Sequence, residues 1–235
     1  LSLRLTREIH KRLMKDVRGN TATPGEFRRS QNWIGPPGST PATASYIPPP
    51  PLEMMECLGT WETFLHDRSL PPLVQVALAH SQFEAIHPFL DGNGRVGRLL
   101  ITLFLVARDI LPSPLLYLSA FFDATRRDYY DRLNGVTREG AWADWLVYFL
   151  NGVARQSEDA LGRSERMMGL LEEWRREAAG GPSKIPLQVL DFLASNPYIT
   201  VKGATAKLGV AFTTAQRAIE RLEKQKVLTQ VGEGR

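Results

Sequence analysis

The chain has 235 residues, 43% of them hydrophobic and 23% charged, and a formal net charge of only +4. This composition is that of a globular protein with one large or two smaller domains, and the small positive charge allows no more than weak attraction to nucleic acid. No apolar run approaches the roughly 18 residues of a membrane span, no signal peptide is present, and the single cysteine, Cys57, excludes an intramolecular disulfide framework. We therefore expect a cytoplasmic protein, and, because the chain opens with Leu1 inside a helical pattern, a piece of a longer one.

The first predicted element is an amphipathic helix. Leu1, Leu5, Ile9, Leu13 and Val17 recur at every fourth residue with charged residues between them, which is the spacing of one buried helix face. The glycine at position 19 ends this pattern.

Residues 21–51 are rich in Pro, Gly, Ser and Thr, with strand-like pieces only at 26–28 and 31–34. A connection of this length inside a compact domain is usually functional or disordered. The prolines at 48–51 leave open a second interpretation, in which the loop binds an SH3-like partner.

Two helices are predicted next, over 52–67 and 73–86. Pro71 and Pro72 open the second, because the N–H that proline lacks would be unpaired in a first helical turn. This helix delivers His87 at its end, where Pro88 forces the chain out of helical conformation. His80 lies two turns earlier on the same face and is interpreted as a supporting residue. With one cysteine and scattered histidines, no zinc site is expected.

The stretch from His87 to Arg98 combines an imidazole, a carboxylate, an amide, three glycines and two guanidiniums between apolar segments. Glycines that open onto a helix leave N–H groups free to bind phosphate. Arg95 and Arg98 add positive charge, Asp91 offers a hard oxygen for Mg²⁺, and His87 is a base near neutral pH. The residues alone therefore predict base-assisted chemistry on a magnesium-bound nucleotide.

The same stretch matches the pattern His-Pro-Phe-x-Asp/Glu-Gly-Asn-Gly-Arg-x-x-Arg at every position, and the chain therefore resembles the Fic family, in particular bacterial Fic proteins. The resemblance implies a mainly α Fic domain with a small β-hairpin flap. It implies transfer of AMP from ATP, with Mg²⁺, to a Tyr, Thr or Ser hydroxyl of a target protein, including the chain itself. Three alternatives stay open: removal of AMP, transfer of another phosphate-containing group, and a mainly DNA-binding regulator.

The resemblance also assigns roles to residues. His87 would be the catalytic base and Asp91 the magnesium ligand, with Asn93 stabilising the oxyanion, Arg95 the leaving pyrophosphate and Arg98 the γ-phosphate. The phosphate-binding set as a whole is Gly92, Asn93, Gly94, Arg95, Val96, Gly97 and Arg98. Tyr129 and Tyr130 would flank the adenine, with Tyr130 the better match. The flap, about residues 25–48, would hold the target by strand addition at Trp33, Ile34 and Gly35.

Further helices are predicted over about 95–108, from 117, over 125–136 and over 140–156, followed by a charged helical stretch to about 176. We divide the chain into a Fic domain at 1–160, a connector helix at 161–182 and a small module at 183–235.

The last module is predicted to be a winged helix-turn-helix: helices over 187–195, 200–208 and 212–224, then a strand over 227–231 that enters a glycine-rich hairpin. Thr213, Thr214, Gln216 and Arg217 would contact DNA from the start of the third helix. Contacts with a partner or within a homodimer are the alternative.

Residues 229–234 fit formally the inhibitory Fic pattern Ser/Thr-x-x-x-Glu-Gly/Asn, but Gly232 is unfavourable in a helix and the position is that of the wing. We interpret the match as chance and expect any inhibitory segment upstream of Leu1, which would leave Arg98 with no carboxylate of that type.

Overall fold

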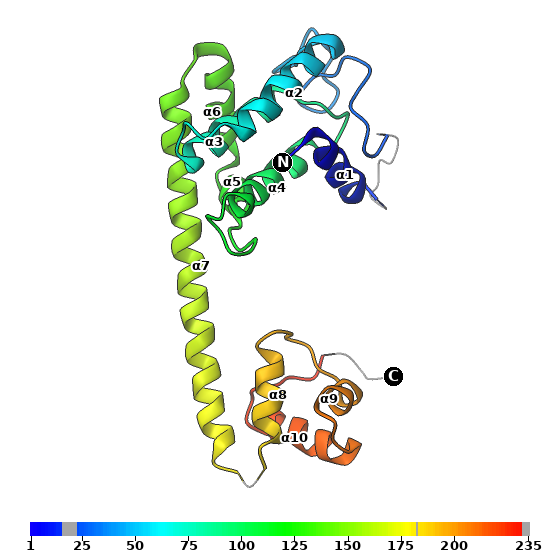
Figure 1. The fold of residues 1–235 in the computed structure, drawn as a ribbon, viewed down its shortest axis with the longest axis vertical. Coiled ribbons are helices and arrows are strands. Elements are labelled where there is room, and N and C mark those ends of the chain that lie inside the picture. The colour runs from blue at the N-terminus through cyan, green and yellow to red at the C-terminus, as the bar shows by residue number, and fades with distance from the viewer. Residues whose placement is uncertain (16–22, 182, 232–235) are drawn as a thin grey trace. The chain divides into compact units, whose positions relative to one another are not determined.

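The computed structural model describes residues 1–15, 23–181 and 183–231 (Figure 1). The described chain divides by its contacts into two compact units, Leu1–Ala160 and Leu161–Arg235. The first unit contains six complete helices: α1 (Leu3–Leu13), α2 (Pro51–His66), α3 (Pro72–Ile86), α4 (Asn93–Ala107), α5 (Leu118–Ala124) and α6 (Arg126–Glu139). Helix α7 (Trp142–Ala179) contributes to both units, and the second unit adds α8 (Ile185–Leu193), α9 (Val201–Leu208) and α10 (Phe212–Lys224).

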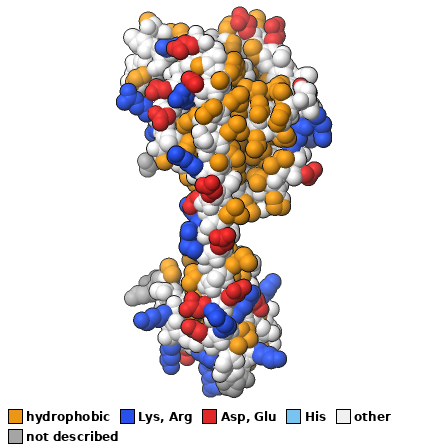
Figure 2. Space-filling view, turned by 90° about the vertical axis from the view of Figure 1, so that its left-hand side faces the viewer, with side chains coloured by type: hydrophobic (Ala, Val, Ile, Leu, Met, Phe, Trp, Pro, Cys, Tyr) orange, Lys and Arg blue, Asp and Glu red, His pale blue; other side chains and the backbone are white. Residues whose placement is uncertain are grey.

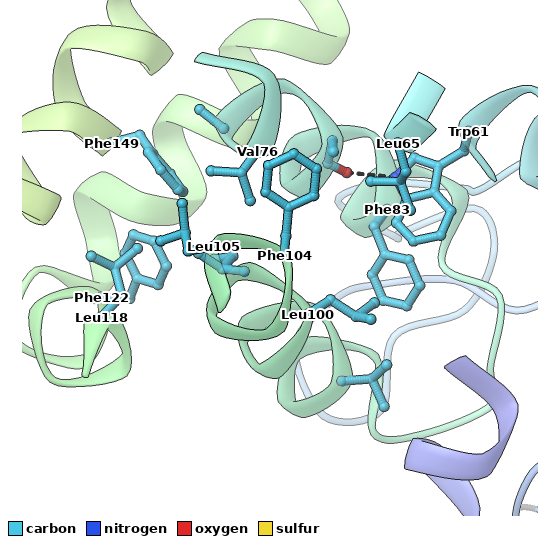
Figure 3. Close-up of a cluster of buried hydrophobic side chains, with 14 of the residues drawn as sticks. Trp61, Leu65, Val76, Phe83, Leu100, Phe104, Leu105, Leu118, Phe122 and Phe149 are labelled. Atoms are coloured by element: carbon cyan, nitrogen blue, oxygen red, sulfur yellow. Dashed lines mark hydrogen bonds between the residues drawn. The ribbon is translucent and has the colours of Figure 1, made fainter. Parts of the chain in front are cut away.

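Helices α3 and α4 form the centre of the first unit, and the bulky side chains of its core surround them. Figure 3 shows Phe83 of α3 beside Trp61 and Leu100, and Phe104 of α4 beside Val76 of α3. Small residues on α3 let the tryptophans approach: the indole N–H of Trp61 donates to the Ala79 carbonyl and that of Trp145 to the Ala77 carbonyl, each at 2.8 Å. Both buried indole donors are therefore satisfied, as buried polar groups require.

Helix α1 is shorter than predicted, and its buried face is only in part the predicted one. On the predicted face Ile9 is buried and Leu1 and Leu13 pack against the core, but Leu5 is 39% exposed. Thr6, His10 and Met14 are buried as well. Thr6 and His10 can be buried because each is hydrogen-bonded, Thr6 to the Ser2 carbonyl and His10 on both ring nitrogens. Val17 and Gly19 lie outside the described residues.

The predicted β-hairpin flap is wrong as a pair of strands. Among the described residues there is no strand, and residues 25–48 form a loop closed by one antiparallel bridge between Ile34 and Tyr46. The bridge consists of Ile34 N–H to Tyr46 O at 2.9 Å, with Ser45 and Tyr46 N–H donating back to Ile34 O. Pro36 and Pro37 follow almost at once, and because proline has no N–H to donate, the ladder cannot extend.

A single helix, α7, of 38 residues replaces the predicted apolar helix over 140–156 and the separate connector. No proline lies between Trp142 and Ala179, and the glycines within it, at 152, 162 and 169, are tolerated in a long helix at a modest cost.

The second unit is a three-helix arrangement around α10. Val189, Leu190, Ala218 and Leu222 form one buried cluster with Ala178, and Ala204, Ala215 and Ile219 form another. Gly209, at φ +65°, ends α9 in the left-handed conformation and turns the chain into α10.

The predicted strand over 227–231 is wrong. The N–H groups of Val227 and Leu228 both donate to the Leu222 carbonyl, and both side chains pack onto the helical core instead of pairing in a sheet. The predicted glycine-rich hairpin, with Gly232, Glu233 and Gly234, lies outside the described residues. The described part of this unit therefore has the helices of the predicted module without its wing.

Surface character differs between the two units. Hydrophobic side chains gather on one face of the first unit, whereas Lys and Arg are prominent on the second (Figure 2). None of the helices formed by the described residues combines the length and apolar character that crossing a membrane requires.

Candidate active site

His87 occupies the C-cap of α3 in the left-handed conformation, with φ +48° and ψ +61°. Pro88 disfavours helical conformation for the residue before it, and the chain reverses here instead. The ring Nδ1 lies 3.3 Å from the Glu84 carbonyl, which favours the tautomer protonated at Nδ1 and leaves Nε2 with a free lone pair. Burial lowers the pKa of His87 to about 4, and the nearby Arg28 charge acts in the same direction. The imidazole is therefore neutral at neutral pH and can accept a proton.

Arg28, which the sequence analysis placed only in the flap, is a buried residue that supports His87. Its Nε donates to the His87 carbonyl at 2.9 Å, and its two terminal nitrogens donate to the carbonyls of Ser30, Pro49 and Ile86. Its own backbone N–H donates to Pro88 O at 2.8 Å. All these acceptors are neutral carbonyls, so the guanidinium connects the flap to the end of α3 without forming an ion pair among the described residues.

Asn93 shapes the loop that follows His87. Its Oδ1 accepts the Phe89 N–H and its Nδ2 donates to the Phe89 carbonyl, both at 2.8 Å, in a buried site. The side-chain amide therefore bonds both backbone groups of Phe89 within the loop.

His10 of α1 holds the loop that follows His87. Its Nδ1 accepts the Gly25 N–H at 2.8 Å, so the ring proton is on Nε2, which donates to the Asp91 carbonyl at 3.0 Å. The ring also stacks on Phe89 with centroids 3.8 Å apart. Burial lowers the pKa of His10, which keeps the imidazole in this neutral tautomer. One histidine thus connects the start of the flap to the loop.

The N-terminus of α4 is the anion-binding part of the site. Gly92, at φ +83°, begins the helix without a side-chain cap. Within the described residues, the N–H groups of Asn93, Gly94 and Arg95 have no recorded acceptor. Such a helix start carries partial positive charge and free donors, the two properties that bind phosphate.

A cavity of about 510 Å³ opens beside this helix start. It is bounded by α3, α4, α6 and the flap, and its lining includes His87, Gly94, Arg98, Tyr130 and Ile34. Tyr130 is 46% exposed and available to a planar ligand, whereas Tyr129 is buried and its hydroxyl is 2.9 Å from His80 Nε2. The structure thus separates the two tyrosines: the Tyr130 ring is exposed, with the Arg126 guanidinium 6.0 Å from its centroid, and Tyr129 is held in the core.

Of the remaining predicted residues, Ile34 and Gly35 of the flap line the cavity. Trp33 precedes them, and its indole N–H donates to the Ser39 carbonyl at 2.8 Å. Val96 is fully buried and Gly97 packs on α3, so both shape α4 rather than face the ligand. Thr213, Thr214, Gln216 and Arg217 are exposed on α10 of the second unit.

Sequence reasoning missed three residues that contribute to the site: Arg28, His10 and Glu84. His10 and Arg28 act through partners far away in the chain, Asp91 and His87, and Glu84 faces Gly97 of the next helix, so no local pattern marks these three residues. The sequence offers one hint of the site: His10 lies within a predicted structural helix and Arg28 within the flap.

A neutral imidazole, a helix start with free N–H groups and a cavity of about 510 Å³ thus lie together in this unit. Residues 1–105, which lie within the first unit, match the Fic/DOC family model.

The chain is 36% identical over 102 residues to "Protein adenylyltransferase Fic" of Drosophila virilis and 37% identical to that of Drosophila erecta. Each match covers 42% of this chain but only about a fifth of the relative, 19% and 18%.

Solved structures share the fold. A Fic family protein from Desulfovibrio desulfuricans gives a TM-score of 0.60 at 20% identity, covering 95% of this chain and 62% of that one. Fic-1 of C. elegans gives 0.53 at 24% identity, covering 71% of this chain and 45% of that one.

Proposed function

We propose that the Fic domain is a protein adenylyltransferase that moves AMP from ATP to a hydroxyl of a protein, including its own chain. The observation that carries the proposal is the position of His87: a neutral imidazole with a free Nε2, at the rim of a cavity that also contains Arg98 and the start of α4. The name of the Drosophila relatives points to the same reaction.

The reaction requires one proton transfer and one displacement. The hydroxyl oxygen of the target forms a bond to the α-phosphorus while its proton passes to His87 Nε2, and the bond from that phosphorus to the pyrophosphate oxygen breaks. A positioned general base of this kind contributes about 10²–10⁴-fold in rate.

Charge on the transferred phosphate would be stabilised by α4. The N–H groups of Asn93, Gly94 and Arg95 provide donors, and the guanidiniums of Arg95 and Arg98 provide positive charge. The Asn93 amide acts indirectly, because its bonds to Phe89 hold the loop in the shape that leaves these donors free.

Asp91 fits a magnesium ion of the kind that accompanies nucleotides. Its side chain is 55% exposed, with Oδ1 accepting the Gly92 N–H and Oδ2 paired to Arg95 at 3.1 Å. The described residues offer no group of three or more acidic, His or Cys ligands, which agrees with an ion held by one carboxylate and by phosphates. When bound, Mg²⁺ neutralises phosphate charge; Asp91 is the residue that would hold it.

The flap is proposed as the docking site of the target peptide. The bridge uses the backbone N–H and C=O of Ile34, so the backbone groups of Trp33 and Gly35 point to the other edge. Within the described residues their N–H groups have no recorded partner, and an extended peptide could pair with them.

The test is transfer from ATP labelled on the α-phosphate or, separately, on the γ-phosphate, to the chain itself and to proteins of a cell lysate. We expect incorporation from the α label only, and its loss in His87→Ala with ATP affinity nearly unchanged. Incorporation from the γ label would show phosphate transfer instead, and release of AMP from pre-modified protein would show the reverse reaction.

Asp91→Ala should remove the difference in ATP affinity between magnesium and EDTA.

The second unit supports a separate proposal, that α10 contacts DNA through Thr213, Thr214, Gln216 and Arg217. These residues are exposed, whereas Ala215, Ala218, Ile219 and Leu222 bury the opposite face. Fluorescence anisotropy with duplex DNA should show affinity that falls between roughly 50 and 200 mM salt. Self-association without DNA binding, measured by sedimentation, would favour the homodimer alternative.

A further inference from the structure

Glu84 of α3 is a partly buried acid that the proposed chemistry leaves without a role. It lies one helical turn before His87 and lines the same cavity. Its Oε1 is buried and has no hydrogen-bond partner among the described residues. An unpaired buried carboxyl oxygen is costly, and in a native protein such a group commonly marks a function.

The surroundings of Glu84 fix its place in the cavity. Across from it, α4 presents Gly97, where a Cβ would come within 2.6 Å of Oε1, so the missing side chain makes room for the carboxyl. Burial raises the pKa of Glu84 to about 7, and the positive charge of Arg98 partly opposes this rise. Glu84 in turn raises the pKa of Tyr129 on α6. The carboxyl therefore lines the same cavity as Arg98 and the two tyrosines.

That position corresponds to the middle of a nucleotide. If phosphates bind Arg98 and the base lies against Tyr130, the sugar that joins them must pass between these two groups. Sugar hydroxyls are hydrogen-bond donors, and Glu84 is the only acidic residue among the described residues that line the cavity. We propose that Glu84 accepts hydrogen bonds from the ribose hydroxyls of the bound nucleotide and makes the site selective for ribonucleotides. This inference rests on the proposed function, because it assumes that the cavity binds ATP.

The other titratable and charged groups near the carboxyl do not supply the missing donor. The His80 Nε2 and the Tyr129 hydroxyl are paired with each other, and His87 Nδ1 faces the Glu84 backbone carbonyl instead of its side chain. No ion pair joins Arg98 to Glu84 in the described part of the chain, although its charge acts on the carboxyl. No described side chain bonds the carboxyl, and because Glu84 lines the cavity, a ligand bound there is its remaining partner.

The test is calorimetric binding of magnesium ATP and of magnesium 2′,3′-dideoxyATP to the whole chain and to variants. A hydrogen bond to a charged group is worth roughly ten- to hundred-fold in affinity. We expect the wild-type chain to prefer ATP by about that factor, Glu84→Gln to keep part of the preference because its amide oxygen still accepts, and Glu84→Ala to bind both nucleotides alike. Glu56→Gln, an exposed acid on α2 outside the cavity, is the matched control and should behave as wild type.

The outcomes separate the inference from the proposed function. ATP binding with the same preference in wild type and Glu84→Ala would overturn the role of Glu84 and leave the adenylyltransferase proposal intact. A wild-type chain that binds no ATP would overturn both. Thermal unfolding guards against a folding defect: because Oε1 makes no hydrogen bond, Glu84→Gln should melt no lower than wild type.

Discussion

The Nε of Arg28 donates to the carbonyl of His87 at 2.9 Å. His87, the proposed base, has a left-handed backbone, and this bond helps to hold it in that conformation. A non-glycine residue in that conformation costs of order 1–3 kcal/mol, so it persists only where its surroundings fix it. The flap and the base are connected through the same guanidinium, because Arg28 also donates to Pro49 and Ser30.

Arg28→Lys should therefore reduce turnover much more than ATP binding. An ammonium cannot reproduce the planar fork, so some of the carbonyls of Ser30, Pro49, Ile86 and His87 lose their donor, each at about 1–3 kcal/mol. We expect a lower kcat, a nearly unchanged KM for ATP and a lower Tm. Arg29→Lys, at an exposed neighbour paired with Glu26, is the control and should leave all three unchanged. A fall in ATP affinity alone would contradict a positioning role.

Asn93→Asp should distort the reactive loop although the shape of the side chain is preserved. The carboxylate still accepts the Phe89 N–H, but its other oxygen faces the Phe89 carbonyl, where Nδ2 now donates. Loss of this buried bond costs about 1–3 kcal/mol, to which acceptor repulsion adds. Urea unfolding measures the stability, and nucleotide binding should weaken in parallel. An unchanged free energy of unfolding would show that the Asn93 side chain does not hold the loop.

Two glycine-to-alanine changes in helices should have opposite signs. At Gly97 the new Cβ would lie 2.6 Å from Glu84 Oε1 and 3.1 Å from Phe83 Cδ1, so the carboxyl and the Phe83 ring would have to shift. At Gly59 of α2 nothing lies within 4 Å of the Cβ, and alanine gains up to about 1 kcal/mol in helix propensity. Gly97→Ala should lower the Tm and Gly59→Ala should raise it. A stabilised Gly97→Ala variant would show that the two helices are not closely packed at this point.

The first unit should lose stability as the pH falls from about 6.5 towards 4. His80 and His87 have folded pKa values of about 3 and about 4, and burial lowers that of His10 as well. In this range the unfolded chain binds more protons than the folded one, so the stability present above about pH 6.5 is lost on acidification.

The raised pKa of Glu84 acts in the opposite sense between about pH 4.5 and 7, because there the folded chain holds the extra proton. Glu84→Gln should therefore steepen the loss measured by urea unfolding at a series of pH values; a flat profile would contradict the buried neutral histidines.

The sequence was sufficient for elements defined by local rules. The ends of α2, α3 and α10 follow from prolines, periodicity and turn residues, and the residue types of 87–98 are enough by themselves to indicate phosphate chemistry. Sequence failed where a residue acts through distant partners. Nothing near Arg28 shows that its guanidinium reaches the carbonyls of α3, and Leu228 satisfies every local criterion of a strand although it packs against α10.

The placement of Asn93 and Phe104 on one continuous helix has a further consequence. The first turn of α4 offers the free N–H groups, and further along the same helix Leu100, Ile101, Phe104 and Leu105 are buried in the core (Figure 3). The reactive end therefore cannot unwind far before the core does. Heat inactivation should coincide with the main unfolding transition instead of preceding it as a separate, low-temperature loss of activity. Calorimetry and residual activity followed over the same temperature ramp should give superimposable curves, and amide exchange at Val96 should be as slow as at Ile101.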